Sequence, residues 1–295
     1  MTMSLLVGYT ATPAGEDALT LGVRLARGRN THLDVVIVLH SEERPTIVPT
    51  DLGYERHLID LATGWLKAAR ALVPDDVVVH THLVSAESFA DGLLETAERL
   101  NSEMIVVGAA RHGLLGRFTI GSVASSLLHV SHVPLALAPE GTRNKGIDRP
   151  LSRVTCAIGT RVGAEALIDE SIKLAASGGV PLRLVSLVGV DVPGGYDDPE
   201  VLRTGAAHAE TAAEHARAAL SDDASVTTEV ASGHSIEDAV TRLSWDPDEI
   251  VMVGSSRLAQ PRRLFLGSTA AKMLHELPVP MVVVPRHVAT PKAGE

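Results

Sequence analysis

Short apolar runs alternate with longer segments of mixed polarity along the whole chain. The runs have the length and the Val, Ile and Leu content of buried strands, and the segments between them repeat apolar positions with a helical period. In the first half we predict strands at 5–9, 33–40, 77–83, 103–109 and 134–139, and helices at 14–27, 55–72, 88–100 and 122–132. The corresponding strands of the second half are 154–159, 182–189, 226–232, 249–255 and 280–285. This alternation predicts an α/β fold of two doubly wound units, each a five-stranded parallel sheet with helices on both faces.

The second half of the chain repeats the first. GAARHGLLGRFTIGS, which begins at Gly108, aligns without a gap on GSSRLAQPRRLFLGS, which begins at Gly254, at an offset of 146 residues. The identical pairs include Arg111 and Arg257, Arg117 and Arg263, Gly121 and Gly267, Ser122 and Ser268, His129 and His275, and Pro134 and Pro280. The starts of the two halves match more loosely, each with an apolar run, a small-residue turn and an amphipathic helix. We therefore predict a tandem duplication.

The domain boundaries follow from this repeat. We place the first domain at 1–140 and the second at 151–286. Residues 141–150 contain turn and charged residues without an apolar period, so we predict a linker there, and we expect 287–295 to form a flexible tail.

Composition narrows the function classes. Aromatic residues make up 3% of the chain, so Val, Leu, Ile and Ala must build the cores, as in parallel sheets. The formal net charge of -10 argues against non-specific nucleic-acid binding. No uncharged apolar run approaches membrane-spanning length and no signal-peptide pattern is present, so we expect a cytoplasmic protein without a membrane partner. Cys156 is the single cysteine, and its apolar surroundings indicate a buried small side chain.

The two repeated loops carry the candidate chemistry. Each follows an apolar strand and ends in Gly-Ser before a helix, so we expect Ser122 and Ser268 to be N-caps. A helix N-terminus offers free N–H groups and a partial positive charge, which favour an anion. Glycines at positions 108, 121, 254 and 267 would allow the backbone to approach a phosphate closely. The loops hold five arginines and no acidic residue, which an anion pocket would need.

This arrangement resembles the universal stress protein family over nearly the whole chain. In the ATP-binding members the motif Gly-x2-Gly-x9-Gly-Ser/Thr holds the phosphates and ribose, and an aspartate after the first strand contributes to the nucleoside end. The resemblance implies a Rossmann-like fold, similar to that of the adenine nucleotide alpha hydrolases. It also implies that the last strands of the two units pair across a pseudo-two-fold axis, which makes the chain an internal dimer and leaves a homodimer of chains open.

Both halves depart from the family motif at the same two positions. Arg111 and Arg257 replace the second glycine, and Thr10 and Gly159 stand where the aspartate is expected. Each arginine could bind a phosphate or fill the space that the phosphates would occupy. We expect two pockets where the strand order of each sheet reverses. The first is lined by Thr10, Gly108, Arg111, Gly121 and Ser122, and the second by Gly159, Gly254, Arg257, Gly267 and Ser268.

The predicted function is a non-enzymatic universal stress protein in stress adaptation or signalling, with altered sites for ATP, another adenine nucleotide or another phosphorylated ligand. The alternative is an interaction or scaffold protein with arginine-filled pockets, a protein partner of unknown identity and no nucleotide. Enzyme motifs give no support to catalysis, because G-x-S-x-G, the P-loop motif and a G-x-G-x-x-G after either first strand are all missing from the sequence.

Four histidines complete the candidates. His80 and His82 alternate along one strand and share a face, which is the geometry of a two-histidine metal site. No carboxylate or cysteine follows them at ligand spacing, so we expect an edge or solvated pair and assign no metal. His129 and His275 occupy equivalent positions near the end of the last helix of each unit, where a histidine favours the helix dipole.

Overall fold

The computed structural model describes residues 3–41, 52–109, 121–159, 164–187, 198–221, 224–255, 264 and 266–285. The first unit consists of β1 (Ser4–Gly8), α1 (Pro13–Arg29), β2 (His32–His40), α2 (Leu52–Leu72), β3 (Val79–Ala86), α3 (Phe89–Leu100), β4 (Ser102–Gly108), α4 (Ser122–Val130) and β5 (Leu135–Ala138). A short 3-10 helix, η1 (Thr142–Lys145), follows. The second unit consists of β6 (Arg153–Ile158), α5 (Ala164–Gly178), β7 (Leu182–Ser186), α6 (Pro199–Ala219), β8 (Val226–Val230), α7 (Ile236–Arg242), β9 (Glu249–Gly254), α8 (Ser268–Glu276) and β10 (Met281–Val284).

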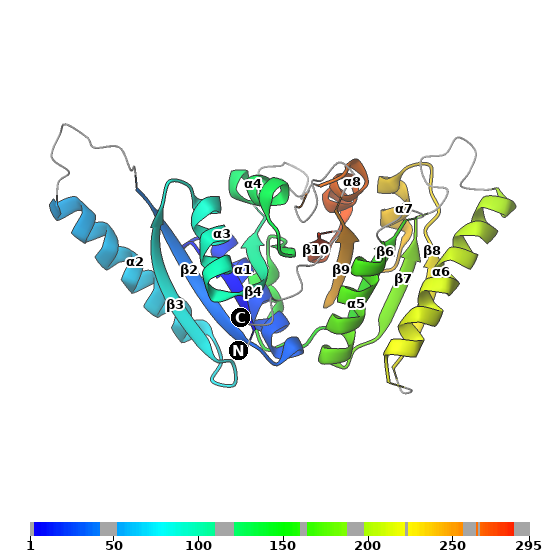
Figure 1. The fold of residues 1–295 in the computed structure, drawn as a ribbon, viewed down its shortest axis with the longest axis horizontal. Coiled ribbons are helices and arrows are strands. Elements are labelled where there is room, and N and C mark those ends of the chain that lie inside the picture. Colours follow the sequence, from blue (N-terminus) through cyan, green and yellow to red (C-terminus); the bar gives the residue numbers. More distant parts are fainter. Residues whose placement is uncertain are drawn as a thin grey trace, which may run out of the picture.

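The strands form one ten-stranded sheet in the order β3-β2-β1-β4-β5-β10-β9-β6-β7-β8. All strand pairs within each unit are parallel. The two units lie side by side in Figure 1, with α2 and α6 at its opposite ends. The predicted α/β architecture of two doubly wound five-stranded units is therefore confirmed.

The apolar pattern places a separate core on each face of the sheet. One core joins strand residues such as Val7 and Val35 to the buried sides of α1, α2, α5 and α6. The other joins strand residues such as Leu6 and Val36 to α3, α4, α7 and α8. Because successive residues of a strand point to opposite faces, strands covered on both sides need continuous apolar runs.

Helix boundaries follow from local side-chain chemistry. Thr12 is the N-cap of α1, where its side chain accepts from the backbone N–H of Gly15, and Pro13 follows in the first turn. Asn30 and Asn101 end α1 and α3 in the left-handed region, which asparagine tolerates better than most residues. The expectation that Ser122 and Ser268 are N-caps is wrong. Gly121 and Gly267 are the caps, and each serine is already the first residue of its helix.

Two features join the units. β5 and β10 pair in antiparallel register, with Leu137 opposite Met281, so neither strand is left as an open edge. The predicted pairing of the last strands is therefore confirmed. On one face, α1 packs against α5, and a Cβ built on Gly28 would lie 3.8 Å from the Cα of Gly178. The chain thus forms an internal pseudo-dimer with one continuous sheet.

The segment between the units is held to both of them. The carboxylate of Asp17 on α1 accepts from the backbone N–H of Gly141 at 3.2 Å and of Arg143 at 2.7 Å. The guanidinium of Arg24, which is almost fully buried, donates to the carbonyl of Arg149 at 2.9 Å and to the carboxylate of Asp248 at 2.9 Å. Although its sequence lacks an apolar period, this segment is an ordered part of the interface. The tail predicted at 287–295 lies outside the described residues.

Candidate functional site

The strand order determines where a ligand crevice can form. β1 lies between β2 and β4, and β6 lies between β7 and β9. The connections that follow β1 and β4 therefore run toward opposite sides of the sheet, and a crevice forms between the carboxyl ends of these two strands. The same holds for β6 and β9 in the second unit. Thr10 and Gly108 belong to the first of these edges, and Gly159 and Gly254 belong to the second. The predicted site residues at the strand ends thus lie at the topological switch points.

In the first unit the strand ends are in backbone contact with the start of α1. A Cβ added to Gly15 would lie 1.9 Å from the carbonyl oxygen of Thr10, and one added to Gly108 would lie 2.1 Å from the carbonyl oxygen of Ala14. Both distances are far shorter than any real contact, so only glycine allows this approach. The structure therefore brings Thr10 and Gly108 to the same helix turn. Sequence reasoning missed Gly15, and its only signal was a small residue early in a predicted helix.

The turn after β1 is neutral and internally hydrogen-bonded. The hydroxyl groups of Thr10 and Thr12 lie 2.8 Å apart, and the backbone N–H of Thr12 donates to the carbonyl of Thr10 at 2.7 Å. Thr10 therefore presents a hydroxyl where the family motif has a carboxylate. It can accept or donate one hydrogen bond to a ligand but adds no charge.

The helices after the repeated loops differ from the other α-helices whose N-caps the structure describes. α4 and α8 have glycine N-caps, no side-chain hydrogen bond to the cap and no acidic residue in the first turn. By contrast, α1, α3, α6 and α7 are capped by the side chains of Thr12, Ser88, Asp198 and Ser235, and each has an acidic residue in its first turn. An acid or a capping side chain would compete with an anion for the free N–H groups. Ser122 and Ser268 are exposed at these two helix starts.

The second unit is not an exact copy of the first. The carbonyl of Gly159, at the end of β6, lies 2.9 Å from Nε2 of His208 on α6. Gly254 is exposed, and among the described residues a Cβ added to it would meet only Cδ2 of Leu167, at an ordinary 3.7 Å. Among the described residues, the close backbone approach seen at Gly108 has no counterpart at Gly254. His208 was missed from the sequence because only the fold brings α6 to the end of β6.

Arg111 and Arg257 lie outside the described residues, as do the other loop arginines. The two roles considered for them, binding a phosphate or filling the pocket, both remain predictions. Cys156 is fully buried, and burial raises the pKa of its thiol to about 12, which confirms its expected role as a small core side chain. His129 and His275 lie in the last turns of α4 and α8, as predicted.

The expectation of an edge or solvated histidine pair is only partly right. β3 is an edge strand, and the side chain of His80 is 57% exposed. His82, however, is mostly buried, and its Nε2 lies 2.7 Å from Oδ1 of Asp34 on β2. The sequence did not indicate Asp34 as a partner of His80 and His82, because Asp34 lies on a different strand. Its signal was a charged residue within the apolar run of 33–40.

Comparisons with known proteins agree with this architecture. The model of the universal stress protein family matches residues 1–139 and 151–285. Universal stress proteins of Mycobacterium tuberculosis and Mycobacterium bovis are 30% identical over 295 residues, which covers 96% of this chain and 100% of theirs. The crystal structure of a universal stress protein from Archaeoglobus fulgidus covers 96% of this chain and 98% of its own, with a TM-score of 0.66 and 15% identity. Within the described residues, no helix has the length and apolar content needed to cross a bilayer.

Proposed function

The chain belongs to the universal stress protein family, and on this premise we propose that it binds an adenine nucleotide or another phosphorylated ligand as a non-enzymatic module of stress adaptation. The phosphates would lie at the N-terminus of α4 in the first unit and of α8 in the second. The nucleoside end would lie toward the turns after β1 and β6.

One observation carries this proposal. Among the described α-helices, α4 and α8 are the two whose first turns contain no acidic residue, and both have glycine caps, which carry no side chain that could accept from the first N–H groups. They are also the two helices that follow the repeated Gly-Ser loops. Charge-assisted hydrogen bonds from such N–H groups to a phosphate contribute roughly 1.5–3 kcal/mol each.

The lack of a carboxylate after β1 and β6 predicts weak binding. Losing one charge-assisted hydrogen bond costs about 2 kcal/mol, or roughly thirtyfold in affinity. The first unit is the stronger candidate, because Gly15 and Gly108 hold its strand ends against α1. In the second unit the carbonyl of Gly159 is already engaged by His208. We therefore expect at most one of the two sites to bind ligand at micromolar concentrations.

The test begins with freshly purified protein. Denaturation followed by chromatography should release an adenine nucleotide, and calorimetry with ATP should give a measurable affinity. Ser122→Ala should weaken ATP binding by about 1 kcal/mol, because an exposed hydroxyl beside the phosphate is lost. Ser126→Ala is the matched control, since Ser126 is also exposed on α4 but lies one turn further from the helix start, and it should leave affinity unchanged.

A negative result in both experiments would contradict nucleotide binding. If no nucleotide is released and ATP, ADP and cyclic AMP all give no heat of binding, the site does not take adenine nucleotides. That result would favour the alternative, in which Arg111 and Arg257 fill the pockets and the chain acts through a protein partner.

A further inference from the structure

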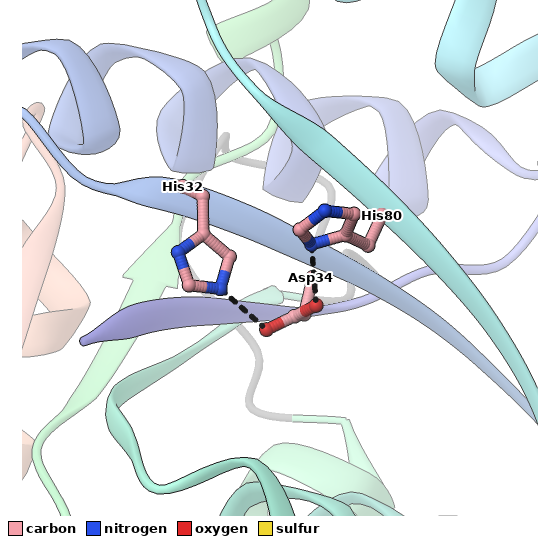
Figure 2. Close-up of side chains that lie close together, drawn as sticks. All are labelled: His32, Asp34 and His80. Carbon is pink, nitrogen blue, oxygen red and sulfur yellow. Dashed lines mark ion pairs between the residues drawn. The ribbon is translucent and has the colours of Figure 1, made fainter. Parts of the chain in front are cut away.

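A second cluster of titratable side chains lies at the amino-terminal ends of the strands, where β2 and β3 begin (Figure 2). His32 and Asp34 alternate along β2, and the strand register places His80 of β3 directly beside Asp34. The three side chains therefore lie on the same face of the sheet, where β2 and β3 begin. Since this is the amino-terminal end of the strands, the cluster is separate from the switch point after β1.

The donor atoms of this cluster are close to one another. Nε2 of His32 lies 3.5 Å from Oδ2 of Asp34, and Nδ1 of His80 lies 3.6 Å from Oδ1 of the same carboxylate. One ligand atom from each of the three residues can be chosen so that all lie within 4.8 Å of one another. Ligands about 2.0–2.1 Å from a tetrahedral zinc ion are separated by about 3.3 Å, so only small side-chain movements would be needed.

Asp34 has an unsatisfied oxygen at the centre of the cluster. Its side chain is 3% exposed, and Oδ2 makes no hydrogen bond of standard distance and angle to a described residue, although the Ser4 side chain also interacts with this carboxylate. A buried carboxylate oxygen without such a hydrogen bond normally requires a cation or a further donor.

In the second unit, a different set of side chains lies at the equivalent position of the sheet. Arg183 follows Leu182 on β7 as Asp34 follows Leu33 on β2, and the register pairs Arg183 with Thr227 as it pairs Asp34 with His80. Arg183 donates to the carboxylates of Glu229 at 3.0 Å and Glu249 at 2.8 Å. In the second unit, the positive charge of Arg183 is therefore neutralised by these two carboxylates. The first unit instead places a carboxylate among imidazoles and leaves it incompletely paired.

We propose that His32, Asp34 and His80 bind one divalent transition-metal ion, of which Zn²⁺ is the representative. Two imidazole nitrogens and one carboxylate oxygen form a three-ligand set that leaves a fourth position open to solvent. His82 would act as an outer-shell partner, because its Nε2 lies 2.7 Å from Oδ1 of Asp34 and orients the carboxylate. Mg²⁺ and Ca²⁺ do not suit this set, since both prefer oxygen ligands.

The ion would link the edge strand β3 to its neighbour β2. His80 belongs to β3, the outermost strand of the first unit, and the other two ligands belong to β2. A metal bound across these strands would stabilise the folded chain by an amount that rises with the logarithm of its free concentration once that exceeds the dissociation constant. This role is independent of nucleotide binding, so either proposal can fail without the other.

The test is calorimetric titration of the full chain with zinc sulfate at pH 7.5. The wild-type protein should bind one Zn²⁺ that His80→Gln loses or binds at least tenfold more weakly. His80 is suited to this test because its side chain is 57% exposed, so the variant should keep its fold and its circular dichroism spectrum. Asp34→Asn should abolish the same binding event, and the His80 variant decides the matter if the Asp34 variant does not fold.

His215→Gln is the matched control. His215 lies 3.0 Å from Asp169, and both are exposed on the surface of the second unit, so this is a histidine–carboxylate pair with the same contact chemistry. The control should retain the wild-type Zn²⁺ affinity. Zinc should also raise the melting temperature of the wild-type and control proteins but not that of His80→Gln.

Two results would overturn the proposal. One is no Zn²⁺ binding by the wild-type chain in this titration. The other is an equal Zn²⁺ affinity in the wild type, His80→Gln and His215→Gln, which would place any bound zinc elsewhere.

Discussion

At the residue scale, Gly108 and Gly254 hold the same position of the repeated motif but experience different surroundings. A side chain at Gly108 would meet the backbone of Ala14, whereas among the described residues one at Gly254 would meet only Cδ2 of Leu167. The repeat predicts equal roles for the two glycines. The close approach at Gly108 depends on the first turn of α1, which the sequence of the motif does not include.

This difference predicts unequal effects of the same substitution. Gly108→Ala should lower the free energy of unfolding by about 1–3 kcal/mol, because the backbone of β4 and α1 must separate to admit a methyl group. Gly254→Ala should change it by about 0.5 kcal/mol or less. Urea unfolding followed by circular dichroism measures both values. Equal destabilisation by the two variants would show that the contact between Gly108 and Ala14 is not as close as described.

At the scale of elements, α1 supports the segment that connects the two units. Asp17 is buried on this helix and accepts from the backbone of Gly141 and Arg143 and from the Arg143 side chain at 2.7 Å. Glu16 precedes it but is half-exposed, and its carboxylate is 4.0 Å from Nε of Arg143. The two neighbouring acids therefore contact the same arginine with very different degrees of burial.

Asp17→Ala should destabilise the chain by about 2–3 kcal/mol, since several charge-assisted hydrogen bonds are lost together. Hydrogen exchange of the amides in 141–145 should also accelerate. Glu16→Ala serves as the control and should cost about 1 kcal/mol or less, as expected of a solvated ion pair. If both variants behave alike in urea unfolding, the buried carboxylate does not hold η1 in place.

At the scale of the whole molecule, buried charges as well as β5 and β10 join the units. Arg24 of the first unit reaches Asp248 of the second and the carbonyls of Arg149 and Pro150 between them. Its guanidinium is 1% exposed, and burial lowers its pKa despite the carboxylate partner. Nearby, Arg29 of α1 pairs with Glu170 of α5 at 3.3 Å.

Arg24→Ala should therefore cost about 3–5 kcal/mol, because it removes one partner of a buried pair. Arg27→Ala is the control on the same helix. Arg27 pairs with Asp76 and Asp148, whose side chains are 59% and 76% exposed, and donates to the carbonyl of Ile147 at 3.3 Å, so each of these solvated pairs should contribute about 1 kcal/mol or less. The measurement is urea unfolding followed by both tryptophan fluorescence and circular dichroism. An Arg24 variant as stable as the wild type would mean that this pair does not couple the units.

Sequence patterns alone determined the type and order of the elements, because burial on both faces of a parallel sheet requires apolar runs such as 33–40 and 249–255. They also revealed the duplication and the family, through the repeated Gly-Ser loops. Only the tertiary structure decided which residues meet across elements. It brought Gly15 and Ala14 against the strand ends, gave α4 and α8 glycine caps, and placed Asp34 beside His80. These contacts depend on strand register and helix packing, which join positions far apart in the chain.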